Sequence, residues 1–185
     1  IVMTTAMFRP GVKTEGVSKV IDSCVELKKR GHRILLVVIG DGVNRAFLES
    51  EGQQKLGDDV LFLGKIPRLE LYRYYSAADV FAFPGIQESL GMVYLEAQSS
   101  GLPVVALEDW GASEAVQHNV TGLLSPAAQP DVFITNIEQL LNNRKQRIAM
   151  REAAKKHIRE KHDAMVNYQK VESVLESIVE QSRKQ

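Results

Sequence analysis

The feature that most constrains the fold is the alternation of short aliphatic runs with segments of helical periodicity. Ile34–Ile39 is a continuous aliphatic run, which is typical of a strand buried on both faces of a parallel sheet. Between Gly16 and Arg30 the apolar residues recur at helical spacing, and Gly31 stands where glycine commonly ends a helix. Strands that alternate with helices form βαβ units, in which helices cover both faces of a parallel sheet.

The same reasoning divides the rest of the chain. We expect strands at Ile1–Phe8, Ile34–Ile39, Val60–Leu63, Val80–Phe83, Pro103–Ala106 and Thr121–Leu124. We expect helices at Gly16–Arg30, Asn44–Gln54, Arg68–Ala77, Gly91–Ser100, Gly111–Gln117, Asp131–Leu141, Arg144–Arg159 and Ala164–Gln181. The sequence therefore predicts a doubly wound, Rossmann-like α/β domain. Its parallel sheet has about six strands, with helices on both faces and a helical C-terminal tail.

Composition excludes several classes of protein. The 185 residues suggest one domain, and 23 lysines and arginines balance 23 aspartates and glutamates. A nucleic-acid binder usually has a basic excess, so we expect no nucleic acid partner. No apolar run approaches the ~20 residues that span a bilayer. The single cysteine, Cys24, allows no intrachain disulfide, which favours the cytoplasm, and we expect it to be a small buried hydrophobe.

Ligands of such sheets bind at the carboxyl ends of the strands, where helix N-termini present unpaired N–H groups. The candidate loops are Arg9–Glu15, Gly40–Asn44, Gly64–Pro67, Pro84–Gly91 and Glu108–Glu114. We therefore expect the functional site to lie in these five segments.

The loop after the fourth strand carries the strongest signal, because it contains Glu88 and leads to Glu96 in the following helix. Gly91 leaves the backbone bare at the start of this helix, so that the N–H groups of Gly91, Met92 and Val93 can reach an anion. A carboxylate deeper in the helix can accept hydrogen bonds from vicinal hydroxyls, such as those of a ribose. The alternative makes Glu88 a favourable charge near a helix N-terminus and Glu96 a solvated residue.

Read as a whole, Pro84–Ala97 is similar to the signature of the group-one glycosyltransferases, the family-4 retaining enzymes of the GT-B fold. Further segments follow in the family's order: Gly40-Asp41-Gly42, Phe62–Ile66, Ala78-Asp79-Val80, Ser100–Ala106, Gly111, Glu114 and Asn119–Leu124. Each piece is weak alone, but the ordered set covers about residues 1–160. The chain thus resembles this family over most of its length.

The resemblance implies that residues 1–185 are a fragment, the single C-terminal, donor-binding domain of an enzyme with two Rossmann-like domains. The partner would be its own N-terminal, acceptor-binding domain, and the donor substrate a nucleotide-diphosphate sugar. Transfer would proceed with retention at the anomeric carbon and without cofactor or metal ion. We expect the isolated fragment to be inactive. The enzyme would be cytoplasmic, with membrane contact only through the full-length protein.

The resemblance also implies catalytic roles for three side chains. Glu88 would hydrogen-bond the hydroxyls of the donor sugar and orient its anomeric carbon. Arg9 and Lys13 would neutralise the diphosphate as it leaves, which requires fixed cations where charge develops. The family usually has a glycine directly after this lysine, whereas Thr14 follows Lys13, so the alignment of the loop is open and a solvated loop lysine is the alternative.

The remaining expected residues bind the donor. In the family's pattern Glu96 holds the ribose hydroxyls, the start of its helix faces the phosphates and sugar, and the backbone near Lys65 recognises the base. The donor-binding set is Gly64, Lys65, Ile66, Ser89, Leu90, Gly91, Met92, Val93 and Glu96.

Two other enzyme classes fit less well. A nicotinamide-dependent dehydrogenase would need a Gly-x-Gly-x-x-Gly turn after the first strand, where Phe8–Gly11 stands instead. In the later Gly40–Gly42 turn, Arg45 occupies the place of the third glycine. A metal-dependent glycosyltransferase of the other common fold would need an Asp-x-Asp element, which does not occur.

The non-enzyme alternatives are a nucleotide-binding or partner-binding module without turnover, and an interaction protein. The latter would use the apolar stripe between Val171 and Val179 as a docking face. We expect instead that residues 161–185 form a terminal crossover helix, whose stripe packs on this domain or on the missing one.

Overall fold

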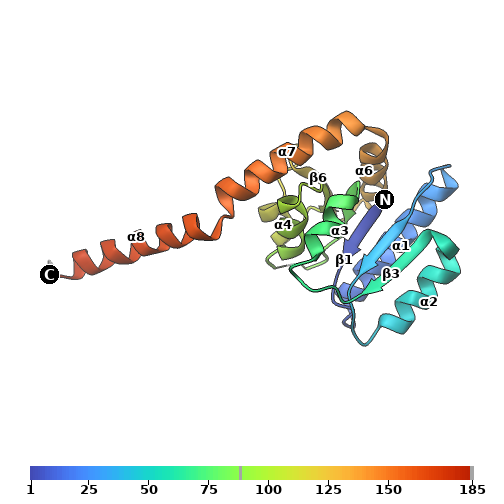
Figure 1. Ribbon diagram of the computed structural model, residues 1–185, viewed down its shortest axis with the longest axis horizontal. Helices are drawn as coiled ribbons and strands as arrows, with labels where there is room; N and C mark the ends of the chain where they lie inside the picture. Colours follow the sequence, from blue (N-terminus) through green and yellow to red (C-terminus); the bar gives the residue numbers. More distant parts are fainter. Residues whose placement is uncertain (88, 184–185) are drawn as a thin grey trace.

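A computed structural model describes residues 1–87 and 89–183 (Figure 1). Within these ranges the strands are β1 (Val2–Thr5), β2 (Leu36–Ile39), β3 (Val60–Gly64), β4 (Val80–Ala82), β5 (Val104–Leu107) and β6 (Gly122–Ser125). The helices are α1 (Val12–Lys29), α2 (Arg45–Leu56), the 3₁₀ turn η1 (Gly57–Asp59), α3 (Leu71–Ala77), α4 (Met92–Ser99), α5 (Trp110–Ala115), α6 (Pro130–Asn142), α7 (Arg144–Lys161) and α8 (Ala164–Arg183). Every element expected from the sequence is present in this order.

The six strands form one parallel sheet in the order β3-β2-β1-β4-β5-β6. The chain builds outward from β1 to β3, then returns to the other side of β1 and builds outward again to β6. The chain therefore leaves the adjacent strands β1 and β4 in opposite directions along the sheet, which makes their carboxyl ends a topological switch point. The predicted Rossmann-like, doubly wound fold is confirmed.

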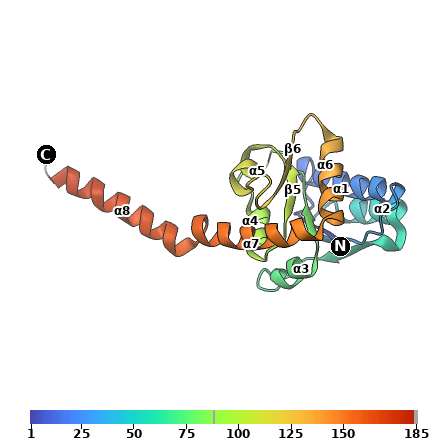
Figure 2. The ribbon, with the colours of Figure 1, turned by 90° about the horizontal axis from the view of Figure 1, so that it is seen from above.

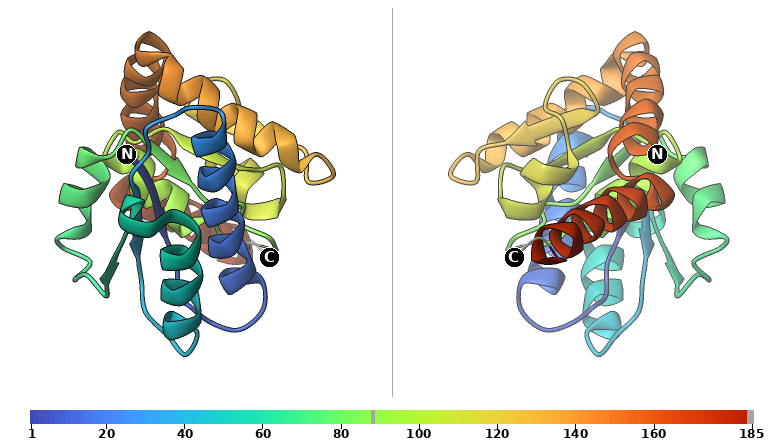
Figure 3. Two further views of the ribbon diagram at one scale, coloured as in Figure 1. Left: turned by 90° about the vertical axis from the view of Figure 1, so that its right-hand side faces the viewer. Right: turned by 90° about the vertical axis from the view of Figure 1, so that its left-hand side faces the viewer.

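Helices cover both faces of the sheet. In Figures 2 and 3, α1, α2 and α6 lie on one face, and α3 and α4 lie on the other. The helical spacing seen in the first helix is the reason for its position, since Val17, Val20, Ile21, Cys24 and Leu27 are all fully buried against the sheet. The core therefore lies between the sheet and these two helix layers.

The largest difference from the expected boundaries lies between β1 and α1. The strand ends at Thr5 rather than at Phe8, because the backbone of Phe8 bonds to the loop after β2: its N–H donates to Asp41 O, and its carbonyl accepts from Asn44 N. The helix begins four residues before Gly16, since Gly11, at φ +84°, redirects the chain first. The expected loop is thus shortened, and its second half is the first turn of α1.

The C-terminal tail is helical, as expected, but α8 leaves the domain (Figure 1). The stripe residues Val171, Leu175 and Ile178 are 55–58% exposed. Asp163 caps the new helix by accepting from Val166 N at 3.0 Å, directly after α7 ends, so the chain changes direction before it can return to the sheet. The stripe does not pack on this domain; packing on a second domain stays a prediction. No helix within the described ranges is long and apolar enough to cross a membrane.

Cys24 is buried in α1, and burial raises the pKa of its thiol to about 12. We expect iodoacetamide to leave the folded protein unlabelled at pH 8 and to label it fully in denaturant, measured by mass spectrometry. Because the folded state keeps this proton above the ordinary thiol pKa of 9.0, the thiol should lower the free energy of unfolding as pH rises beyond that value. Rapid labelling of the native protein would contradict the buried position.

Candidate functional site

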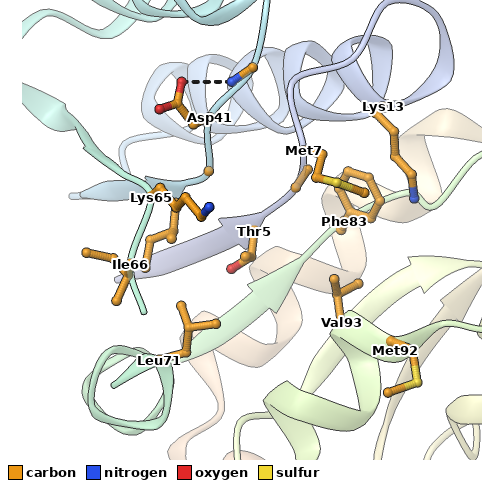
Figure 4. Close-up of a pocket in the computed structure, with 14 residues that line it drawn as sticks. Thr5, Met7, Lys13, Asp41, Lys65, Ile66, Leu71, Phe83, Met92 and Val93 are labelled. Atoms are coloured by element: carbon orange, nitrogen blue, oxygen red, sulfur yellow. Dashed lines mark hydrogen bonds between the residues drawn. The ribbon is translucent and has the colours of Figure 1, made fainter. Parts of the chain in front are cut away.

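A cavity of about 670 Å³ opens at the carboxyl edge of the sheet, at the switch point between β1 and β4 (Figure 4). Its wall combines the ends of β1 and β2, the residues after β3 and β4, and the first residues of α1, α3 and α4. Proteins with open parallel sheets bind their ligands at this edge. The volume lies within the range of about 300–1,000 Å³ that is usual for small-molecule sites.

Two lysines enter the cavity from opposite sides (Figure 4). Lys13 stands in the first turn of α1, and its Nζ lies 5.5 Å from the centre of the Phe83 ring. Lys65 follows β3 and lies beside Ile66. The early start of α1 brings Lys13 to this wall, and its expected role as a phosphate ligand stays a prediction.

The Gly40-Asp41-Gly42 turn forms the wall between these lysines on the β2 side. Gly40 has φ +148° and is pressed so closely against β1 that a Cβ would lie 1.9 Å from the carbonyl oxygen of Ala6. Asp41 Oδ1 accepts from Gly42 N at 2.8 Å, and its other oxygen lies 3.5 Å from Arg45. The negative charge of Asp41 makes this end of the cavity unfavourable for an anion.

The opposite end of the cavity is formed by the N-terminus of α4. Gly91 precedes the helix at φ +65°, where a Cβ would lie 2.6 Å from Gly111 O, so the tight approach requires glycine. The side chains of Met92 and Val93 line the cavity (Figure 4). Their N–H groups stand in the first turn of α4, where amides have no acceptor within the helix. Together with Lys13, this end of the cavity can hold an anion.

Glu96 lies one turn further along α4, on the same helix face as Val93. Its side chain is 28% exposed and lies 3.5 Å from the guanidinium of Arg68. It stands beside the cavity rather than in its wall. The expected ribose-binding role of Glu96 therefore stays a prediction that this position permits.

The structure brings together five of the predicted residues in the cavity wall: Lys13, Lys65, Ile66, Met92 and Val93. Gly64 and Gly91 shape the turns next to it through their positive φ.

Arg9, Ser89 and Leu90 are exposed and do not contribute to the wall. The loop holds Arg9 by its backbone, whose carbonyl accepts from Thr14 Oγ1 at 2.6 Å, and this leaves the guanidinium outside. Glu88 lies outside the described residues, so its role stays a prediction.

Sequence reasoning missed the apolar part of the wall. Thr5 and Met7 at the end of β1, Leu71 at the start of α3 and Phe83 after β4 all line the cavity. The sequence places these residues near the carboxyl ends of strands or at a helix start. The alternation of strands and helices does not show which residues at such a position end the strand and which line a cavity. Among the described residues, no group of three or more histidine, cysteine, aspartate and glutamate side chains could hold a metal ion.

Known proteins resemble this chain in sequence. The family model described as "Glycosyl transferases group 1" matches residues 7–157. A D-inositol 3-phosphate glycosyltransferase of Corynebacterium aurimucosum is 38% identical over 78% of this chain and 36% of its own length. A GDP-mannose-dependent alpha-(1-6)-phosphatidylinositol monomannoside mannosyltransferase of Mycobacterium tuberculosis is 32% identical over 80% of this chain and 40% of its own. The chain spans 28–40% of the length of these and similar relatives.

Solved structures show the same fold at lower identity. The C-terminal domain of a group 1 family glycosyl transferase from Francisella tularensis has a TM-score of 0.75 at 22% identity, covering 88% of this chain and 86% of that one. An Anabaena protein in complex with UDP has a TM-score of 0.80 at 20% identity, covering 95% of this chain and 48% of that one. These two structures therefore share the fold of this chain over 88% and 95% of its length.

Proposed function

We propose, since this chain belongs to the glycosyl transferases of group 1, that it is the donor-binding half of an enzyme that moves a sugar from a nucleotide-diphosphate sugar to an acceptor. The observation that carries the proposal is the cavity at the switch point, whose wall includes Lys13, Lys65 and the N-terminus of α4. The similar Anabaena protein binds UDP, and the similar mycobacterial enzyme depends on GDP-mannose. Both diphosphates are therefore candidate probes.

The charges of the wall support one orientation of the donor. Asp41 disfavours phosphate at the β2 end, whereas Lys13 and the amides of Met92 and Val93 favour it at the α4 end. The base then lies toward Lys65, on the side of the cavity away from α4 (Figure 4). The ribose between them lies on the side of Glu96.

In this orientation negative charge develops on the leaving phosphate where fixed positive groups already stand. Lys13 and the first amides of α4 stabilise the departing diphosphate without rearrangement, which lowers the barrier to bond cleavage. We propose that these groups act in place of a metal ion and that transfer proceeds with retention at the anomeric carbon. Glu88 then orients the donor sugar.

A second domain is part of the proposal, because the matched relatives are much longer than this chain. That domain binds the acceptor, and residues 161–185 cross over to it with the apolar stripe of α8 facing it. The isolated chain binds donor and transfers nothing. The complete enzyme acts in the cytoplasm, and any membrane contact is made through the full-length protein.

The charge of Lys13 is expected to strengthen diphosphate binding. In calorimetric titrations with UDP, GDP, UMP and GMP, Lys13→Met should lower the affinity for the diphosphate about tenfold and the affinity for the monophosphate by less. The matched control is Lys170→Met, at an exposed position of α8 outside the cavity, which should leave affinity unchanged. If the unaltered chain bound no nucleoside diphosphate, the proposal would be overturned.

The alternative function is a binding module without turnover, and it is tested with the nucleotide that the titration identifies. Joined to the missing domain, the chain should transfer sugar from the nucleotide-diphosphate form of whichever base it binds, measured as release of the diphosphate. Binding without transfer in the complete protein would favour the module.

A further inference from the structure

A second cavity, of about 300 Å³, lies at the amino-terminal edge of the sheet, opposite the edge that holds Lys13. One of its walls contains Asp79 and Pro103, which directly precede β4 and β5. The other wall is the first half of α7, which begins beside the N-terminus of the chain (Figures 1 and 2). This helix contributes three arginines to the cavity, spaced three and four residues apart and therefore on one helix face: Arg144, Arg147 and Arg151.

The middle arginine, Arg147, is held in place by the fold. Its guanidinium donates to the carbonyl oxygens of Leu140 and Leu141 at 2.5 and 2.7 Å and lies 3.3 Å from Asp79 Oδ1. The other carboxylate oxygen of Asp79 accepts from the nitrogen of Ile1 at 2.6 Å. The acidic side chain in the described wall is therefore already engaged at both oxygens.

Arg144 and Arg151 flank Arg147 by about one turn on either side. Neither guanidinium has a hydrogen-bond or ion-pair partner among the described residues. The stem of Arg151 lies against Gly101, where an added Cβ would be 2.9 Å from Arg151 Cγ. Two unpaired cations and one paired cation thus share a small cavity, and their mutual repulsion is relieved when an anion binds between them.

The rest of α7 adds to this positive charge. The helix contains eight lysines and arginines and two glutamates, whereas the whole chain has equal numbers of basic and acidic residues. The balanced net charge of the chain therefore conceals one strongly basic helix. Such a concentration of charge raises the local concentration of anions at the cavity.

We propose that this cavity is a phosphate-binding site, separate from the donor site, in which Arg144 and Arg151 bind the phosphate group on either side of the fixed Arg147. A planar guanidinium donates two parallel hydrogen bonds to phosphate oxygens, which an ammonium group does not. The phosphate group belongs either to a soluble phosphate ester or to the headgroup of an anionic lipid, since both present the same oxygens to the arginines. The site does not depend on the proposed function.

The test follows the side-chain Nε–H signals of the three arginines by NMR while the chain is titrated with inorganic phosphate at low salt. We expect these signals to shift and saturate together. In the double variant Arg144→Gln/Arg151→Gln, the remaining Arg147 signal should report an affinity about tenfold lower. Added salt should weaken binding to the unaltered chain, because the site is partly exposed.

The matched control is Lys145→Gln/Arg159→Gln, which removes the same charge from exposed positions of α7 outside the cavity. It should leave phosphate affinity at the cavity nearly unchanged. The variant Arg144→Lys/Arg151→Lys keeps the charge but loses the planar donors, and its affinity should fall severalfold. The midpoint of thermal unfolding should not fall in Arg144→Gln/Arg151→Gln, because neither side chain has a partner in the fold.

Vesicles distinguish the two sources of phosphate. Cosedimentation with phosphatidylcholine vesicles that contain phosphatidylglycerol, lost in Arg144→Gln/Arg151→Gln and kept in the control variant, would identify a lipid headgroup. Binding of phosphate without such cosedimentation would identify a soluble phosphate ester. Absence of saturable shifts at the three arginines, or equal losses of affinity in the Arg144→Gln/Arg151→Gln and control variants, would overturn the inference and leave the proposed function intact.

Discussion

Replacement of Glu96 by alanine is expected to weaken nucleoside diphosphate binding by about 1.5–3 kcal/mol, as loss of hydrogen bonds to a charged acceptor does. Glu96 lies one turn beyond the residues of α4 that line the cavity, with its side chain only 28% exposed. The partly buried position strengthens its hydrogen bonds relative to those of a solvated carboxylate. Calorimetry with UDP and GDP measures the loss and identifies the base in one experiment.

The control for Glu96 is Glu152→Ala. Glu152 is a 69% exposed glutamate of α7 that lies outside the cavity wall, and its removal should leave affinity unchanged. Thermal unfolding of both variants separates loss of binding from loss of fold. Unchanged affinity of Glu96→Ala for every nucleotide tested would remove Glu96 from the site.

The second large effect is expected on stability. Gly40→Ala should lower the free energy of unfolding by more than about 3 kcal/mol, because overpacking against a backbone that cannot move, added to backbone strain, is one of the mechanisms that produce large losses. The new Cβ would lie 1.9 Å from the backbone oxygen of Ala6 and 2.9 Å from the ring of Phe8. The residue also has φ +148°, which L side chains rarely adopt. Denaturant titration followed by circular dichroism measures the loss.

Gly31→Ala is the matched control for Gly40. Gly31 also has a positive φ of +91°, but nothing lies within 4 Å of its added Cβ. Its substitution should therefore cost only the backbone strain, about 1 kcal/mol. Equal losses at the two positions would show that strain, and not the close approach of the β2 turn to β1, requires glycine at Gly40.

Most of the fold could be predicted because buried periodicity is a local property. The fully aliphatic run that ends at Ile39 and the helical stripe that includes Ile21 and Leu27 each identify an element and its buried face. The boundary between β1 and α1 could not be predicted in this way. It depends on hydrogen bonds from Phe8 to the loop after β2, which is more than thirty residues away in the chain.

The site was predicted in part for the same reason. Met92 and Val93 could be predicted because a glycine at a helix start leaves a signal in the sequence, whereas Lys65 was expected only from the resemblance to the family. Arg9 was expected beside Lys13, yet the helix that begins at Val12 carries Lys13 to the cavity while Arg9 stays exposed on the loop. The apolar stripe of α8 could be predicted from its helical spacing, but that spacing does not show which surface the stripe packs against.

The order of elements, the parallel sheet and the loops that could carry a site were determined by the amino-acid sequence alone, because burial pattern and turn residues act within a few positions of the chain. Only the tertiary structure decided that Lys13 and the start of α4 face one cavity and that Asp41 makes its other end unfavourable for phosphate. These are distances between segments far apart in sequence, and they are set by how helices pack on the twisted sheet.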